Sequence, residues 1–148
     1  MREIRLDLPW PPSVNHYKTV GKIVTTKTGK LYQERRNSNE TKTFYFEVYI
    51  KTKHIPYAEG SKFRFREEIP LELVVWLHPP HHKRYDIDNR LKVLLDSLVH
   101  AKIISDDSQI TRLFVEKLDM IPEGKVVVTI REYFLGVTSH VSQPRTTP

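Results

Sequence analysis

Two carboxylates that lead into a predicted helix are the feature of this sequence best suited to chemistry. Only Ile87 separates Asp86 from Asp88, so in an extended segment both side chains project from the same side. Carboxylates this close repel each other unless a cation joins them. Oxygen ligands suit Mg²⁺ or Mn²⁺, which use few protein carboxylates and keep several waters. The pair therefore predicts a divalent-metal site. Helix capping is the structural alternative, because Asp is favoured at the start of a helix.

A lysine and a second acidic pair extend this pattern. Lys92 follows Asp88 by about one helical turn, and Asp96 follows Lys92 by another, so the three share one helix face. A lysine beside bound metal would stabilise a pentavalent phosphate or a leaving oxygen. Alone, it would form an i, i+4 ion pair with Asp96, which we expect to be its structural partner. Asp106 and Asp107 follow the helix and supply either a further ligand or a solvated turn.

Other kinds of site are excluded or disfavoured. The sequence has no cysteine, which excludes thiolate nucleophiles, disulfides and Cys-ligated zinc or iron–sulfur centres. His78, His81 and His82 do not have a known tetrahedral zinc spacing, so an exposed loop or a phosphate contact is expected there. No Gly-rich phosphate loop or Gly-x-Ser-x-Gly elbow occurs.

The positive charge of the chain is concentrated in one segment. The 148 residues include 24 Lys and Arg against 18 Asp and Glu, a formal net charge of +6. Residues 15–54 carry nine basic and three acidic side chains, an excess equal to the whole net charge. Such a segment suits the phosphates of nucleic acid. A solvated basic face that aids solubility is the alternative.

The elements that must position these residues form a mixed α/β or α+β domain. Alternating Ile4, Leu6 and Leu8 predict a strand that ends at Pro9. A buried strand is predicted over 71–77, and leucines at positions 91, 94, 95 and 98 predict a helix over 88–102. Residues 109–119 and 125–133 are predicted to be two strands of a hairpin, and residues 13–30 a loop or hairpin. Residues 34–53 fit either a helix begun at Ser38 or a strand, because the segment is rich in aromatic and β-branched residues.

Length and composition indicate one globular domain with a tail. At 39% hydrophobic and 28% charged residues the chain is too apolar to be wholly disordered. No apolar run is long enough for a membrane span, and the N-terminus lacks a signal-peptide core. We therefore expect a cytoplasmic protein and a disordered tail over residues 136–148.

Three motifs in register resemble the RusA-type Holliday junction resolvases. The stretch from Leu8 to Asn15 (LPWPPSVN) resembles the opening of that family. The stretch from Asp86 to Lys92 (DIDNRLK) resembles its central motif, and residues 106–109 (DDSQ) its third block. The order and spacing agree from about residue 3 to residue 133.

The resemblance implies a RusA-like α+β domain over residues 1–135, with a small mixed sheet packed by helices. It implies a nucleoid-associated homodimer that cuts four-way DNA junctions symmetrically with Mg²⁺ or Mn²⁺, and it favours the helix within residues 34–53. Carried over residue by residue, Asp86, Asp88 and Asp107 would bind metal, Lys92 would be the catalytic lysine and Asn89 its polar neighbour. The basic residues expected to bind DNA are Lys18, Lys27, Lys30, Arg35, Arg36, Lys83, Arg84 and Arg90.

The approach to the first carboxylate differs from the arginine-rich family pattern, because it reads HHKRY here. This difference bears on junction affinity and sequence preference more than on metal chemistry. Two other classes of function could use the same acidic residues. A non-catalytic branched-DNA binding module would use the Asp cluster only to cap the helix. An Asp-x-Asp glycosyltransferase would need a nucleotide-binding domain larger than 148 residues allow.

Overall fold

The fold is a mixed α+β arrangement, as the sequence predicts. The structure is a computed structural model that describes residues 1–16 and 18–134. Its elements in chain order are β1 (Glu3–Pro9), η1 (Val14–His16), β2 (Lys18–Thr25), β3 (Leu31–Asn37), α1 (Asn39–Thr52), β4 (Leu71–His78), α2 (Ile87–His100), η2 (Asp107–Gln109), β5 (Ile110–Lys117) and β6 (Lys125–Glu132).

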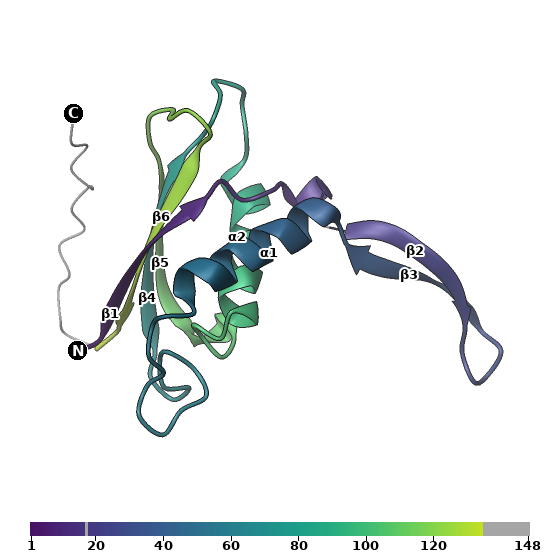
Figure 1. The fold of residues 1–148 in the computed structure, drawn as a ribbon, viewed down its shortest axis with the longest axis horizontal. Helices are drawn as coiled ribbons and strands as arrows, with labels where there is room; N and C mark the ends of the chain where they lie inside the picture. Colours follow the sequence, from purple (N-terminus) through teal and green to yellow (C-terminus); the bar gives the residue numbers. More distant parts are fainter. Residues whose placement is uncertain (17, 135–148) are drawn as a thin grey trace.

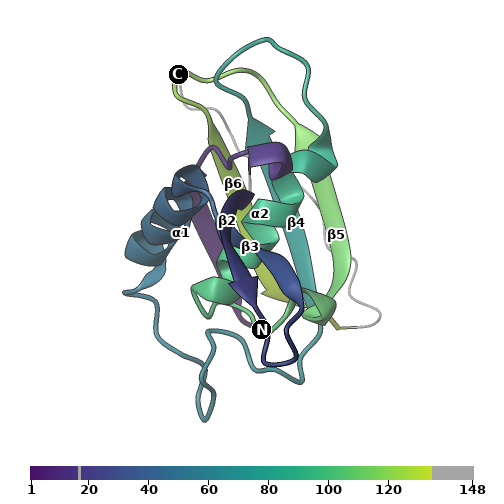
Figure 2. The same ribbon diagram turned by 90° about the vertical axis from the view of Figure 1, so that its right-hand side faces the viewer.

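Strands β1, β6, β4 and β5 form the main sheet in that order. Strand β4 is parallel to β5 and antiparallel to β6, and β1 is antiparallel to β6. Both helices lie on one face of this sheet (Figures 1 and 2). The core fills the space between them, where Val48 of α1 and Leu94 and Leu98 of α2 belong to one buried cluster with residues of β4.

Strands β5 and β6 do not form a hairpin, contrary to the prediction, because β4 lies between them. All eight residues of β4 are buried, so this strand needs a neighbour on each edge to pair its backbone groups. The connection from β5 to β6 passes over the end of β4. There the N–H of Leu118 donates to the carbonyl oxygen of Leu77 at 2.8 Å. The parallel pair β4 and β5 is joined through α2, and this crossover positions the acidic motif.

The ambiguous stretch 34–53 divides at Ser38. Strand β3 continues to Asn37, and α1 begins at Asn39. Ser38 is the N-cap, since its hydroxyl oxygen accepts the N–H of Thr41 at 3.2 Å. The helix begun at Ser38 is therefore confirmed over Asn39–Thr52, and residues 34–37 of the ambiguous stretch belong to β3.

Strands β2 and β3 pair with each other in a separate two-stranded sheet. The hairpin expected within residues 13–30 is therefore confirmed for its first strand and its turn, where Gly29 has φ +80°, whereas its second strand lies beyond that range at Leu31–Asn37. This hairpin, which we call the arm (residues 18–37), extends away from the sheet and the helices (Figure 1).

The other predicted elements are confirmed. In β1 the residues Ile4, Leu6 and Leu8 are buried and alternate with exposed ones, and α2 matches the predicted helix within two residues. The predicted disordered tail, residues 136–148, lies outside the described residues. No helix in the described part of the chain is long and apolar enough to cross a membrane.

Candidate functional site

The start of α2 presents two exposed carboxylates. Asp86 occupies the N-cap position with extended backbone angles (φ −92°, ψ 142°), yet among the described residues its side chain caps no backbone N–H of the helix. Instead its Oδ2 accepts from Nδ2 of Asn89 at 3.3 Å. Asp88 lies in the first turn and is also exposed. The carboxylate of Asp86 therefore does not cap the helix, and the side chains of Asp86 and Asp88 both face solvent.

The two residues of the second acidic pair, Asp106 and Asp107, have different roles. Asp106 is the N-cap of η2, and its Oδ1 accepts the N–H of Ser108 at 2.8 Å. Hydrogen bonds from Ser108 lower the pKa of Asp106, and the positive charge of Lys92 adds to this shift. Asp107 is the first residue of η2 and is exposed. Capping therefore occupies Asp106 and leaves Asp107 as the pair's candidate ligand.

Lys92 lies on α2 between two acidic groups. Its Nζ is 3.0 Å from Oδ1 of Asp96, which confirms Asp96 as its structural partner. This hydrogen bond is the largest cause of a raised pKa for Lys92, and the charges of Asp96 and Asp107 raise it further. Asp107 therefore lies near enough to α2 to act on Lys92. The ammonium group stays protonated at neutral pH, which suits charge stabilisation and does not suit a general base.

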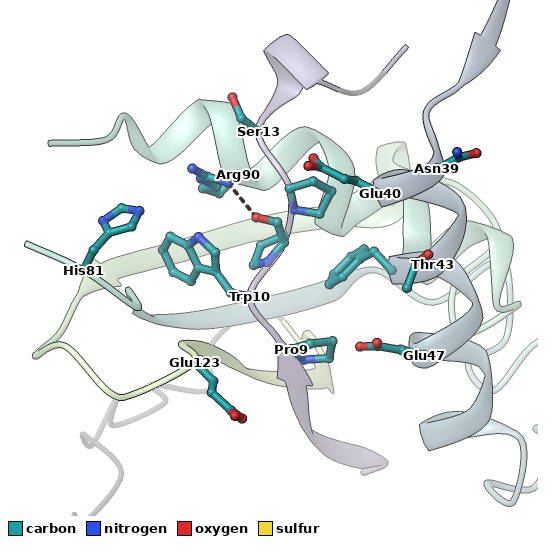
Figure 3. A pocket seen from close by; sticks show the side chains of 13 residues that line it. Pro9, Trp10, Ser13, Asn39, Glu40, Thr43, Glu47, His81, Arg90 and Glu123 are labelled. Carbon is teal, nitrogen blue, oxygen red and sulfur yellow. Dashed lines mark hydrogen bonds between the residues drawn. The ribbon is translucent and has the colours of Figure 1, made fainter. Parts of the chain in front are cut away.

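The proline-rich segment after β1 supports the first turn of α2. Nη1 of Arg90 donates to the carbonyl oxygen of Pro11 at 2.8 Å, the bond drawn in Figure 3. The guanidinium carbon of Arg90 lies 5.1 Å from the centre of the Trp10 ring. Tyr85 meets the same ring edge-on, with centroids 5.1 Å apart and planes at 88°. Burial raises the pKa of Tyr85 and lowers that of Arg90, so this cluster is a packed support.

Lys117 at the end of β5 supports the residue immediately before the first carboxylate. Its Nζ donates to the carbonyl oxygen of Tyr85 at 2.5 Å and lies 4.4 Å from the centre of the Tyr85 ring. Sequence reasoning missed Trp10, Tyr85 and Lys117 as parts of the site. A sequence signal existed for two of them, because Trp10 stands within the proline-rich motif LPWPPSVN and Tyr85 directly precedes the acidic motif DIDNRLK. Lys117 carried no signal of its own.

A cavity of about 690 Å³ lies between the proline-rich segment and α1 (Figure 3). Glu40 and Glu47 of α1 and Glu123 line it together with Trp10 and Arg90. None of the three predicted metal ligands is among its described lining residues. Because carboxylates repel phosphate, this cavity does not suit a DNA backbone.

The basic residues predicted to bind DNA lie in three places. Arg90 is turned inward, as described above. The side chains of Lys83 and Arg84 are exposed in the loop before α2. The remaining members of the set belong to the arm: Lys18, Lys27, Lys30, Arg35 and Arg36. Positive charge therefore lies next to the acidic motif, in the loop before α2, and also along the arm.

The predicted ligands are not drawn together into one tight cluster. Among the described residues, no three His, Asp or Glu side chains lie close enough to hold a metal ion by themselves. The donor set still fits Mg²⁺ or Mn²⁺ chemically, because carboxylates are hard oxygen ligands and Mg²⁺ binds through one or two of them plus water and substrate phosphate. The histidines do not offer a zinc site, since His78 is buried and its Nδ1 lies 2.9 Å from the carbonyl oxygen of Asp119.

Comparison with known proteins places this arrangement in a family. Residues 9–131 match the family model described as endodeoxyribonuclease RusA. The chain is 30% identical over 139 residues to the crossover junction endodeoxyribonuclease rusA of Enterobacteria phage HK97, covering 89% of this chain and 97% of that protein. Identity is 26% with the protein of the same name from Enterobacteria phage 82 and 25% with that from Escherichia coli (strain K12), each over 134 residues with the same coverage. The chain belongs to the RusA endodeoxyribonuclease family.

Proposed function

We propose that this protein is a metal-dependent endodeoxyribonuclease that resolves four-way (Holliday) DNA junctions by paired, symmetric hydrolysis of phosphodiester bonds. Family membership over most of the chain supports this function, and so do the relatives' names as crossover junction endodeoxyribonucleases. The observation that carries the proposal is the uncapped, solvent-facing carboxylate of Asp86 beside Asp88, with Lys92 held protonated on the same helix.

Asp86, Asp88 and Asp107 are the proposed ligands for Mg²⁺ or Mn²⁺. When bound, such a metal supplies an activated water and neutralises charge on the reacting phosphate. Asn89 orients the carboxylate of Asp86 through the 3.3 Å hydrogen bond between the two side chains. The spread of the carboxylates fits an ion held jointly by a few protein oxygens, waters and the DNA phosphate.

Lys92 has the electrostatic role in this proposal. Its raised pKa keeps the ammonium group charged, and its exposed position leaves it accessible to substrate. A fixed positive charge beside the reacting phosphate stabilises the negative charge that develops in the transition state. The ion pair with Asp96 holds the lysine side chain along α2 before DNA binds.

The basic side chains of the arm and of the loop before α2 would bind junction arms through phosphates, with little reading of bases. A twofold homodimer would present two such sites, and its symmetry would match that of a four-way junction. In this proposal the homodimer explains why cleavage is paired.

The test is a gel assay with a labelled mobile four-way junction beside a linear duplex of equal length, in Mg²⁺, Mn²⁺ or EDTA. The proposal predicts paired nicks, symmetric about the junction, in the four-way substrate alone and only with metal. A junction that is shifted but uncut under every metal would instead favour the non-catalytic binding module. Equal cutting of junction and duplex would contradict junction specificity.

A further inference from the structure

A second cavity, of about 420 Å³, lies where the end of the arm meets the two helices. Its lining is aromatic and basic, in contrast to the cavity beside the proline-rich segment. The described residues that line it are Asn37, Lys42, Tyr45, Phe46, Tyr49 and His100. None of them is acidic, so the cavity suits a ligand that carries negative charge or none. We call this cavity the aromatic pocket.

The rings of the aromatic pocket are placed for stacking. Phe46 and Tyr49 are neighbours on the surface of α1, and they are 63% and 50% exposed. Tyr45 is buried, and its ring lies against that of His100, with centroids 4.9 Å apart and planes at 32°. Aromatic side chains stack on nucleobases whatever the sequence, because every base has a π face. The pocket therefore offers the surfaces on which an unpaired base stacks.

The aromatic pocket is continuous with the helix face that carries Lys92. Asp96 and His100 follow Lys92 at intervals of four residues along α2, and Asp96 is paired with Lys92. After the hydrogen bond to Asp96, the electrostatic effect of Tyr45 is among the contributions that raise the pKa of Lys92. The rise of α2 from Lys92 to His100 is about 12 Å, the length of three or four stacked nucleotides at about 3.4 Å each. A strand with a phosphate beside Lys92 thus reaches the pocket within a few nucleotides.

Positive charge favours a nucleotide over a protein surface as the occupant. Lys42 is exposed and shares a face of α1 with Phe46 and Tyr49. A protein that covered the two rings would also bury the charge of Lys42, which is costly, whereas a nucleotide supplies its own phosphate to that lysine. The basic arm ends at Asn37, on the edge of the pocket, and extends from there away from the helices (Figure 1). A strand bound along the arm through its phosphates therefore passes this pocket.

We propose that the aromatic pocket holds an unpaired nucleobase of the bound junction, stacked on Phe46 and Tyr49, while Lys42 contacts its phosphate. Releasing a base from a duplex costs free energy, and the cost is smallest where the base is already unpaired or poorly stacked. Bases at the branch point lack the continuous stacking of a linear duplex. The pocket thus gives a preference for branched DNA that phosphate contacts alone do not give. This inference rests on the proposed function and adds a DNA-binding site to it.

Affinities for a labelled four-way junction and for a linear duplex of equal length, both measured in EDTA, test this inference. Phe46→Ala and Tyr49→Ala each remove one ring and should weaken junction binding at least roughly fivefold. Duplex binding should change less than roughly twofold, and the salt dependence of both affinities should persist, because the phosphate contacts remain. The matched control is Ile50→Ala, on the same helix and 41% exposed but outside the described lining. It should leave both affinities nearly unchanged.

Two further measurements identify the occupant. Phe46→Leu keeps an apolar side chain but has no π face, so it should weaken junction binding as Phe46→Ala does, whereas Phe46→Tyr should bind as the wild type does. For photocrosslinking, 5-iodouracil is placed either at the branch point or within one arm of the junction, and the complex with wild-type protein is irradiated in EDTA. We expect cross-links to Phe46 or Tyr49, identified by mass spectrometry, from the branch-point position only.

Unchanged junction affinity in both Phe46→Ala and Tyr49→Ala would overturn the inference, and so would cross-links that map to other parts of the chain. Equal losses for junction and duplex would also overturn it, because a paired base does not enter the pocket. If light scattering gave these variants a lower mass than the wild type, the two rings would belong to a contact between protein chains instead.

The outcomes for the pocket and for the proposed function are distinguishable. The expected binding losses and cross-links in a protein that cuts no junction in Mg²⁺ or Mn²⁺ would overturn the proposed nuclease and leave the pocket standing. Metal-dependent junction cleavage together with unchanged affinity in both alanine variants would do the reverse. A wild type that does not bind the junction would overturn both.

Discussion

The guanidinium of Arg90 and the carbonyl oxygen of Pro11 are joined by a 2.8 Å hydrogen bond across 79 residues of sequence. This bond ties the first turn of α2, which carries Asp88, to the proline-rich segment after β1. Burial lowers the pKa of Arg90, and its side chain also lies over Trp10. These contacts indicate that Arg90 positions the acidic motif, whereas the sequence alone suggested a contact with DNA phosphate.

The two possible roles of Arg90, positioning the acidic motif or contacting DNA phosphate, predict different salt dependences of junction affinity. In Arg90→Gln we expect cleavage to fall roughly 10- to 100-fold, because a small displacement of the reacting groups is costly. Junction affinity measured in EDTA should keep its dependence on salt concentration. The matched control is Arg84→Gln, an exposed residue in the preceding loop, which should lower the slope of log affinity against log salt by about one. A lowered slope in Arg90→Gln would assign that residue to phosphate contact.

Lys92 should be required for cleavage, and its charge should not change over the neutral to mildly alkaline pH range. Its pKa is raised above the ordinary value of 10.5, so its charge is fully present below that value and is lost only as pH rises through the higher folded pKa. Lys92→Gln should lower the single-turnover cleavage rate by roughly 10²–10³. The wild-type rate should show no loss attributable to this group between about pH 7 and about pH 9. A descending limb within that range that disappears in Lys92→Gln would contradict this account.

The neighbours Asp106 and Asp107 should respond very differently to the same change. Asp106→Asn keeps a side-chain oxygen that can accept the N–H of Ser108, so the cap of η2 survives. We expect its cleavage rate to stay within roughly threefold of the wild type. Asp107→Asn removes a charged ligand and should reduce cleavage below detection in Mg²⁺. Direct measurement of Mn²⁺ binding by electron paramagnetic resonance should show weaker binding for Asp107→Asn only. Equal losses in both variants would argue against the division of roles.

The local parts of this structure were predictable from sequence. The leucine stripe of α2 and the alternation in β1 are periodic signals that arise within one element, and both elements form as expected. The candidate ligands lie at the two ends of the segment that contains α2, so their spacing could be read along the chain.

The remaining parts depend on contacts between distant residues. No pattern within β5 or β6 says that β4 lies between them, because strand order is set by the burial of β4 on both faces. Helix α1 was ambiguous for a physical reason: it has apolar side chains both on its buried face, such as Val48, and on its exposed surface, such as Phe46 and Tyr49. This distribution weakens the helical periodicity that distinguishes a helix from a strand. The contact of Lys117 with Tyr85 spans 32 residues and brings together two side chains with no motif in common.

The central claim is that the carboxylates at the start of α2 hold the metal that cuts a bound junction. The most direct test is to measure junction affinity in EDTA and single-turnover cleavage in Mg²⁺ and Mn²⁺ for the wild type and Asp86→Asn side by side. The account predicts affinity within roughly threefold of the wild type, since without metal a carboxylate does not attract phosphate, together with cleavage below detection in both metals. Cleavage by Asp86→Asn at the wild-type rate would contradict the account.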